Sequence, residues 1–214
     1  MDSVQGARGV MRLVVEKIAA ERGGRAVFAG LSFVVKAGTL LRVSGANGAG
    51  KTTLLRILAG LAAASEGSAA WHRADAVVSP AEAACFVGHA NAFNDALTVR
   101  ENLTYAAALA GLDASSLDIG CALDAFGVKP MINRGFGTLS QGQRKRCSLA
   151  RLLLNAQRGG RAWLLDEPFV ALDVNTQAKL AAVISAELAA GGLVIYTSHQ
   201  AVEINAANTH EVAL

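Results

Sequence analysis

The sequence predicts an α/β fold in which helices cover both faces of a mostly parallel β-sheet. Short apolar runs alternate along the chain with longer segments of helical periodicity, a pattern typical of parallel sheets. The chain also contains 22 glycines but only 3 prolines, which suits tight turns between strands and helices. At 214 residues it has the length of one large domain or, at most, two small ones.

The runs expected to form strands are short and bounded by turn residues. The first two, Arg12–Glu16 and Leu31–Lys36, are separated by Gly23 and Gly24, and this arrangement favours antiparallel pairing. The later runs are almost wholly apolar, as expected of strands that are buried on both faces of a sheet: Leu40–Ser44, Cys85–Gly88, Ala162–Leu165 and Leu193–Thr197.

Helical patterns lie between these runs. Thr98 with Glu101 forms a capping box, and Ser140 with Gln143 can form a second one, so two helix starts are predicted from local chemistry. Because the sequence pattern of residues 98–137 is helical throughout, we expect a helical subdomain there. It would belong to a single domain of residues 11–214, which follows a flexible tail of residues 1–10. The expected helices are Thr52–Leu61, Val99–Ala110, Leu117–Phe126, Gln141–Asn155 and Thr176–Ala190.

The high hydrophobic content does not indicate a membrane span. Hydrophobic residues make up 52% of the chain, but 43 residues are alanine. The longest stretch without Asp, Glu, Lys or Arg is Leu188–Val202, which is shorter than the roughly 20 apolar residues that cross a bilayer.

Cysteine usage and charge narrow the class of protein further. Cys85, Cys121 and Cys147 form no CxxC pair, so we expect reduced thiols in a cytosolic protein. Neither these cysteines nor His72 and His210 form a cluster of metal ligands. A net charge of +3, from 20 basic and 17 acidic residues, does not favour nucleic acid as a partner.

A phosphate-binding loop is the most specific motif in the chain. It matches GxxxxGK[ST], follows the expected strand Leu40–Ser44 and opens the expected helix. Glycines allow backbone N–H groups to surround phosphate oxygens, Lys51 supplies a positive charge, and the Thr52 hydroxyl suits Mg²⁺. The alternative is a glycine-rich turn with a solvated lysine, which the full pattern in this context disfavours. The predicted nucleotide-binding residues are Gly45, Ala46, Asn47, Gly48, Ala49, Gly50, Lys51, Thr52 and Thr53.

Two carboxylates follow the apolar run Ala162–Leu165. Asp166 is predicted to hold Mg²⁺ together with Thr52, and Glu167 to act as the general base for an attacking water. Adjacent side chains on a strand point in opposite directions, so the two carboxylates are expected to take different roles. Such a pair is often only a solvated strand end, but its combination with a phosphate loop indicates a nucleotide-hydrolysing site.

Three further segments resemble motifs of the ATP-binding-cassette family. Residues 139–143, Leu-Ser-Gln-Gly-Gln, are similar to its LSGGQ signature, Ala171-Leu172-Asp173 to its D-loop, and His199 to its switch histidine. They occur in the order and at the spacings of that family. The resemblance implies a phosphate-loop NTPase fold with a RecA-like parallel-sheet core, an N-terminal antiparallel β subdomain and a helical subdomain.

The resemblance also implies roles for these residues. It implies a head-to-tail dimer of two copies with two ATP molecules at the interface, each accompanied by Mg²⁺. His199 would contact the γ-phosphate and help to position Glu167. Contacts to the nucleotide on the other subunit would come from Ser140, Gly142, Gln143 and Asp173.

Besides Gln141 in the signature segment, the sequence departs from the family pattern at two places. His89 stands where the family usually has the glutamine of its Q-loop. The imidazole could accept a hydrogen bond from a metal-bound water, bind Mg²⁺ itself, or only face a transmembrane partner subunit. No aromatic residue stands where the family stacks one on adenine. Arg22 or Arg25 could stack there instead, whereas Phe28 is expected in the core.

A subfamily resemblance rests on several common features in combination. These are the short chain, Val87-Gly88-His89, Leu97-Thr98-Val99-Arg100-Glu101-Asn102-Leu103, a non-glycine third residue in the signature segment, and Asp166-Glu167-Pro168-Phe169 leading to Ala171-Leu172-Asp173. They resemble the ATP-binding subunits of bacterial cytochrome c biogenesis, or haem exporter, systems. That resemblance implies a peripheral subunit on the cytoplasmic face of the inner membrane, a multi-span permease partner and, indirectly, haem-handling membrane proteins. Such a subunit would couple ATP hydrolysis to haem delivery or to release of a haem-loaded chaperone.

The contact with a membrane partner is expected at residues 90–97. Ala92, Phe93 and Leu97 could receive a short helix of the partner, or Phe93 and Leu97 could pack beneath the helical subdomain. Three other functions stay open: an ATPase subunit for another substrate, a soluble ATPase of DNA repair or translation, and a nucleotide sensor without hydrolysis. The short span from Lys51 to Leu139 argues against the second, and the presence of Glu167 and His199 argues against the third.

Overall fold

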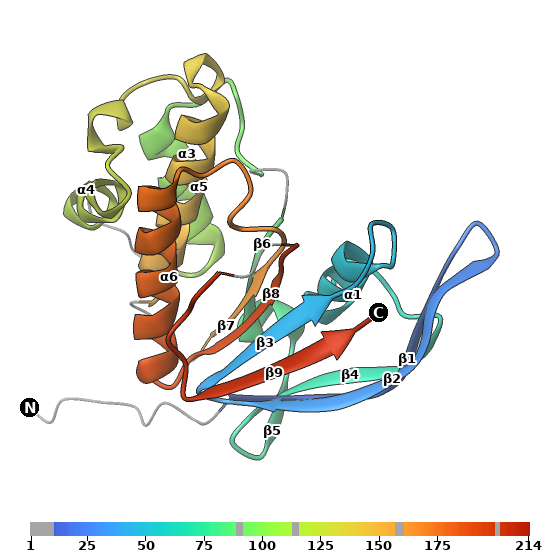
Figure 1. Cartoon of the computed structure of the whole chain (residues 1–214). Coiled ribbons are helices and arrows are strands. Elements are labelled where there is room, and N and C mark those ends of the chain that lie inside the picture. The colour runs from blue at the N-terminus through green and yellow to red at the C-terminus, as the bar shows by residue number, and fades with distance from the viewer. Residues whose placement is uncertain (1–10, 89–91, 113–115, 157–160, 200–201) are drawn as a thin grey trace, which may run out of the picture.

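The computed structural model describes residues 11–88, 92–112, 116–156, 161–199 and 202–214 (Figure 1). The expected tail of residues 1–10 and His89 lie outside the described residues. Within them the strands form two sheets, one antiparallel and one parallel, as the sequence predicts.

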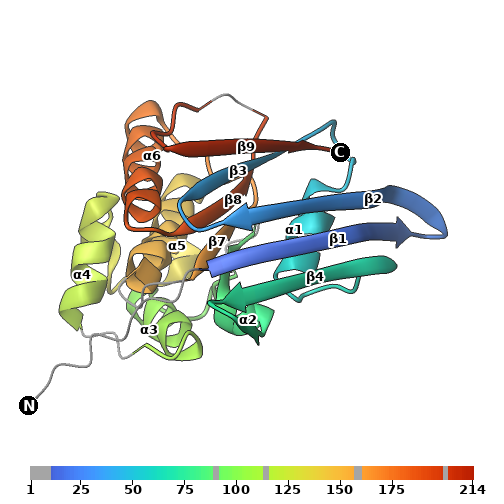
Figure 2. The same ribbon diagram turned by 90° about the horizontal axis from the view of Figure 1, so that it is seen from below.

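The antiparallel sheet has the strand order β2-β1-β4-β5. The two predicted strands are present but longer, because β1 and β2 continue as a hairpin to the Gly23-Gly24 turn, where both glycines have positive φ. The sequence analysis missed β4 and β5. The strand β4 lacks Val, Ile and Thr, the residues that usually indicate a strand, and it forms because it pairs along β1 (Figure 2). The strands are β1 (Met11–Arg22), β2 (Arg25–Lys36), β4 (Glu66–Arg73) and β5 (Ala76–Val78).

The parallel sheet has the order β6-β7-β8-β3-β9. The predicted bounds of β7 and β8 are confirmed, whereas β3 begins one residue earlier than predicted and β6 both begins and ends one residue earlier. The sequence analysis missed β9, whose mostly exposed polar residues pair with β3 at the edge of the sheet. The strands are β3 (Thr39–Ser44), β6 (Ala84–Val87), β7 (Ala162–Leu165), β8 (Leu193–Thr197) and β9 (Asn208–Ala213).

The central strands of the parallel sheet, β7, β8 and β3, are buried on both faces, and their residues alternate between two hydrophobic clusters. Trp163 and Leu165 belong to the cluster on one face, whereas Leu164 between them belongs to the other. The first cluster contains residues of α5 (Gln141–Ala156) and α6 (Val174–Ala189). The second contains residues of α1 (Lys51–Leu58) and of the antiparallel sheet, so α1 packs between the two sheets.

Two further helices lie on the α5 side of the parallel sheet (Figure 1). They are α3 (Val99–Leu109) and α4 (Ser116–Ala125), followed by short 3₁₀ turns at Lys129–Met131 and Phe136–Thr138; the four-residue α2 (Pro80–Ala83) precedes β6. Both predicted capping boxes are confirmed: Glu101 N–H donates to Thr98 Oγ1 at 3.2 Å, and Gln143 N–H donates to Ser140 Oγ at 3.3 Å. Among the described residues, no helix is long and apolar enough to cross a membrane.

The two tryptophans can be compared to test how much a buried indole hydrogen bond contributes to stability. Both are 1% exposed, but the Trp71 indole N–H donates to Leu58 O at 2.8 Å, in the last turn of α1, whereas the Trp163 N–H has no hydrogen-bond partner within the described parts of the chain. We expect Trp71→Phe to lower the free energy of unfolding by about 1–3 kcal/mol more than Trp163→Phe, because it leaves a buried carbonyl unsatisfied. Urea denaturation of both variants measures this difference; equal losses would contradict it.

Candidate nucleotide-binding site

The phosphate loop joins the carboxyl end of β3 to the first residue of α1. Gly45, Gly48 and Gly50 have φ values of 139°, 83° and 102°, a region that residues with a side chain rarely adopt. At Gly50 the constraint is also steric, because a Cβ would lie 2.5 Å from Val27 Cγ1 and 2.8 Å from Phe28 Cδ1. The β2 strand therefore supports the loop from behind, and Phe28 belongs to the core as predicted.

Lys51 stabilises the curved form of this loop. Its ammonium group donates hydrogen bonds to Gly45 O at 2.7 Å and to Ala46 O at 2.9 Å, and the residue is buried. The positive charge therefore lies inside the loop, where a phosphate group of a nucleotide would find backbone N–H donors, the start of α1 and a lysine together.

A pocket of about 250 Å³ opens beside the loop. It combines the phosphate loop with the Glu167 carboxylate and with Arg22 and Val27 from the antiparallel sheet. Arg22, named above as a candidate to stack on the base, is thus brought to the pocket, whereas Arg25 does not line it. The lining residues are Arg22, Val27, Asn47, Gly48, Gly50, Lys51, Thr52, Thr53 and Glu167.

The structure brings the two predicted magnesium ligands together. The Thr52 hydroxyl donates to Asp166 Oδ2 at 2.8 Å, although the two residues are 114 positions apart in the chain. Asp166 is buried directly after β7, and a hydroxyl beside a carboxylate supplies the oxygen ligands that Mg²⁺ prefers. These two side chains fit a magnesium ion next to the phosphate loop.

Glu167 and His199 also meet at this edge of the sheet. His199 Nε2 lies 3.1 Å from Glu167 Oε1, and both side chains are partly exposed. The backbone of Glu167 is left-handed, with φ 49°, a conformation that is unfavourable for a residue with a side chain. The sequence analysis predicted that these two residues act together, but it did not predict the left-handed backbone conformation of Glu167.

The signature and D-loop residues occupy a different part of the surface. Ser140 is exposed and caps α5 with Gln143, and a Cβ on Gly142 would lie 3.9 Å from Ala171 O. Asp173 caps α6, and the hydrogen bond from Thr176 N–H lowers the pKa of its carboxyl. Thus Ser140, Gly142, Gln143 and Asp173 gather near one another, but none of them lines the phosphate-loop pocket.

Two buried polar residues near Glu167 were missed by the sequence analysis. The Thr197 hydroxyl contacts both Asp166 and the Glu167 backbone, and Lys145 Nζ lies 3.5 Å from Glu167 O. Burial lowers the pKa of the Lys145 ammonium group. A hydroxyl at the end of the apolar strand β8 and a lysine on the buried face of α5 are the signals that could have revealed them.

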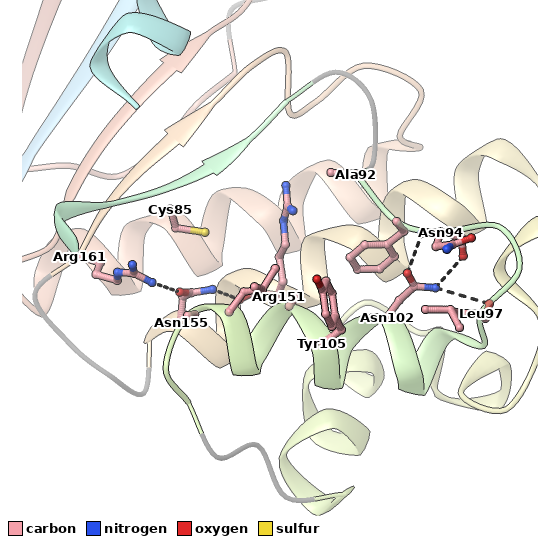
Figure 3. Close-up of a pocket in the computed structure, with 13 residues that line it drawn as sticks. Cys85, Ala92, Asn94, Leu97, Asn102, Tyr105, Arg151, Asn155 and Arg161 are labelled. Atoms are coloured by element: carbon pink, nitrogen blue, oxygen red, sulfur yellow. Dashed lines mark hydrogen bonds between the residues drawn. The ribbon is translucent and has the colours of Figure 1, made fainter. Parts of the chain in front are cut away.

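A larger cavity, of about 590 Å³, lies between the parallel sheet and α3, and we call it the α3–α5 cavity (Figure 3). Phe93 and Leu97 line it, and Phe93 also packs edge-on against Phe136, as expected if Phe93 packs beneath the helical subdomain; the expected contact with a partner helix stays a prediction. The cavity is lined by Cys85, Ala92, Phe93, Asn94, Leu97, Asn102, Tyr105, Ala106, Leu109, Ala110, Arg151, Asn155 and Arg161.

The charged side chains described in the lining of the α3–α5 cavity are basic. Among the described residues that line it, two are arginines and none is acidic. Arg151 donates to Phe86 O at 3.0 Å, but its buried Nε–H has no partner among the residues that the structure describes, and burial lowers the pKa of the guanidinium. Asn102 holds the rim in shape, since its amide accepts from Asn94 N–H at 2.8 Å and donates to Asn94 O at 3.0 Å (Figure 3).

Comparison with known proteins gives one consistent result. The profile of the family described as ABC transporter matches residues 28–170. The chain is 41% identical to the cytochrome c biogenesis ATP-binding export protein CcmA of Albidiferax ferrireducens, over 92% of this chain and 94% of that protein. It is 44% identical to the CcmA protein of Aromatoleum aromaticum, over 88% of both chains.

Solved structures show the same fold at lower sequence identity. An ABC transporter ATP-binding protein from Pyrococcus furiosus matches with a TM-score of 0.76 and 23% identity, over 94% of this chain and 96% of that chain. The ATP binding subunit of another ABC transporter matches with a TM-score of 0.75 and 22% identity, over 87% of this chain and 79% of that chain.

The packing behind the phosphate loop can be tested by substitution of Gly50. We expect Gly50→Ala to weaken ATP binding by at least about tenfold, because the new Cβ forces the loop away from Val27. Gly191→Ala is the matched control: its φ is also positive, at 85°, but no atom lies within 4 Å of the added Cβ. It should cost about 1–2 kcal/mol of stability and leave binding unchanged. Calorimetric titration distinguishes the two; equal affinities would reject the steric argument.

Proposed function

Because the chain belongs to the ABC transporter family, we propose that residues 45–53 bind the phosphates of ATP and that the neighbouring carboxylates catalyse its hydrolysis. The observation that carries this proposal is that the phosphate loop and Glu167 line one pocket, in which Thr52 is hydrogen-bonded to Asp166. Lys51 and the backbone N–H groups stabilise the phosphate charge, and Thr52 and Asp166 hold Mg²⁺, which would neutralise phosphate oxygens.

Glu167 serves as the general base in this proposal. Its carboxylate accepts a proton from the attacking water, and His199, 3.1 Å away, orients that carboxylate. The partial exposure of both side chains leaves room for water and for the γ-phosphate. His89 lies outside the described residues, so its proposed contact with a metal-bound water rests on the family resemblance alone.

We further propose that two copies form a head-to-tail dimer. Ser140, Gly142, Gln143 and Asp173 do not line the phosphate-loop pocket of their own chain, so in this proposal a second copy brings them to the nucleotide. Val174, next to Asp173, is 81% exposed, which is unusual for an apolar side chain and suits a surface that is covered in the dimer. Loss of the γ-phosphate then removes an interaction that holds the two copies together.

The α3–α5 cavity is the proposed docking site for a multi-span membrane permease. Tyr105 and Leu109 are 62% and 72% exposed on its rim, and the unpaired Arg151 Nε–H lies within it. Apolar rim residues around a basic interior suit a partner helix that carries an acidic residue between apolar ones. In this arrangement the chain is a peripheral subunit on the cytoplasmic face of the inner membrane.

Cytochrome c biogenesis is the proposed process. Support comes from relatives named for this function that are 41% and 44% identical across most of both chains. We propose that ATP hydrolysis drives haem export or delivery, or release of a haem-loaded chaperone, through the membrane partner. Affinity purification from membranes tests this step: multi-span subunits and haem-handling proteins should copurify, and copurification with an unrelated substrate system would instead assign the ATPase to that substrate.

The base assignment predicts a separation of binding from turnover. We expect Glu167→Gln to retain ATP affinity but to lower the hydrolysis rate by about a hundredfold or more, because the amide cannot accept the proton. The exposed Glu66, at the start of β4, provides a control, and Glu66→Gln should hydrolyse ATP at the normal rate. Turnover by Glu167→Gln within about threefold of the wild type would exclude Glu167 as the base.

The docking assignment predicts a surface effect without loss of stability. We expect Leu109→Glu to reduce the recovery of copurifying membrane subunits by about fivefold to tenfold, because the interface would bury an unpaired charge. Val77 is similarly exposed, at 70%, but it lies on β5 and does not line the cavity, so Val77→Glu should copurify normally. Equal recovery of both variants would reject the cavity as the docking site.

A further inference from the structure

Thr197 occupies the position where the candidate site is most tightly connected. It is the last residue of β8, the strand that lies between β7 and β3 in the parallel sheet (Figure 1). Asp166 and Glu167 follow β7, and the phosphate loop follows β3. Thr197 is paired with Val43 of β3 and is fully buried, with an exposed fraction of 0%.

The hydroxyl of Thr197 makes two hydrogen bonds whose directions are fixed by chemistry. It donates to Asp166 Oδ1 at 2.9 Å, since a carboxylate can only accept, and it accepts from Glu167 N–H at 2.8 Å, since an amide N–H can only donate. The single hydroxyl hydrogen and one lone pair are thus both used. One side chain therefore holds the carboxylate of Asp166 and the backbone of Glu167 in a fixed relation.

Each of these two hydrogen bonds restrains a group that matters for hydrolysis. Because Thr197 holds Oδ1, the other oxygen of Asp166 faces Thr52, which is the pair that fits Mg²⁺. Because Glu167 has φ 49°, its peptide needs external support, and the hydrogen bond to Thr197 provides it from the N–H side. The direction of the Glu167 side chain toward His199 depends on that peptide.

We propose that Thr197 is a positioning residue for ATP hydrolysis, acting through both Asp166 and Glu167 without contacting the nucleotide. The inference rests on the proposed roles of these two carboxylates. Threonine suits the task because its β-branched side chain has few χ1 rotamers, so the hydroxyl is held in one direction. Serine has the same hydroxyl with a freer χ1, and valine has the same shape without the hydroxyl.

The test compares Thr197→Val and Thr197→Ser with the wild type in the full chain. Mg²⁺-dependent ATP turnover is measured over a range of ATP concentrations and of Mg²⁺ concentrations. We expect Thr197→Val to lower kcat by about tenfold to a hundredfold and to raise the Mg²⁺ concentration for half-maximal activity by at least about threefold. The KM for ATP should change by less than about threefold, since the phosphate loop is intact. Thr197→Ser should recover most of kcat.

Thr39→Val is the matched control, because Thr39 is also buried but starts β3, at the opposite end of the strand from the site. It should turn over ATP as the wild type does. A kcat and a Mg²⁺ dependence of Thr197→Val within about twofold of the wild type would overturn the proposal, as would a Thr197→Ser variant no more active than Thr197→Val.

Two outcomes separate this proposal from the proposed function. A folded wild-type chain that neither binds nor hydrolyses ATP would reject the proposed function itself, whereas an active wild type with an equally active Thr197→Val rejects only the role of Thr197. If Thr197→Val does not fold, as judged by circular dichroism, Thr197→Ala replaces it in the same comparison with Thr197→Ser.

Discussion

The Asp166 carboxylate makes the interaction on which the candidate site depends. One oxygen accepts a hydrogen bond from Thr52 and the other from Thr197, at 2.8 Å and 2.9 Å. These three residues follow or end β3, β7 and β8, which are neighbours in the parallel sheet. Because parallel strands bring their carboxyl ends to one edge, a single side chain can connect the phosphate loop, the proposed magnesium site and the proposed base.

The layers on either side of the sheet hold this edge and divide the other functions of the chain. On one face, α1 and the antiparallel sheet support the phosphate loop, with Val27 and Phe28 packed against Gly50. On the other face, α5 presents the signature residues at its start and Arg151 in the α3–α5 cavity further along. A single helix thus connects the surface proposed for the second copy with the surface proposed for the membrane partner. Movement of α5 would affect both surfaces together.

Sequence patterns predicted the buried elements closely and the exposed ones poorly. The bounds of β7 and β8 are those predicted, and the major helices agree within three residues at each end, because apolar periodicity and the capping boxes are local signals. In contrast, β4 and β9 have few β-branched apolar residues, and they are strands because β1 and β3 offer them backbone partners. Such pairing is a tertiary effect that local propensity cannot reveal.

For the site, the residue types alone predict which chemistry is available. A lysine and glycines suit phosphate, a hydroxyl and a carboxylate suit Mg²⁺, and a glutamate with a histidine can position and activate water. Which of these groups meet depends on the tertiary structure. It placed His199 against Glu167, left Ser140 and Asp173 away from the pocket of their own chain, and added Thr197. The physical reason is that residue type fixes what a side chain can bind, whereas strand order and backbone conformation fix its neighbours. Thr197 lies 31 positions from Asp166, and nothing local in the chain encodes their contact.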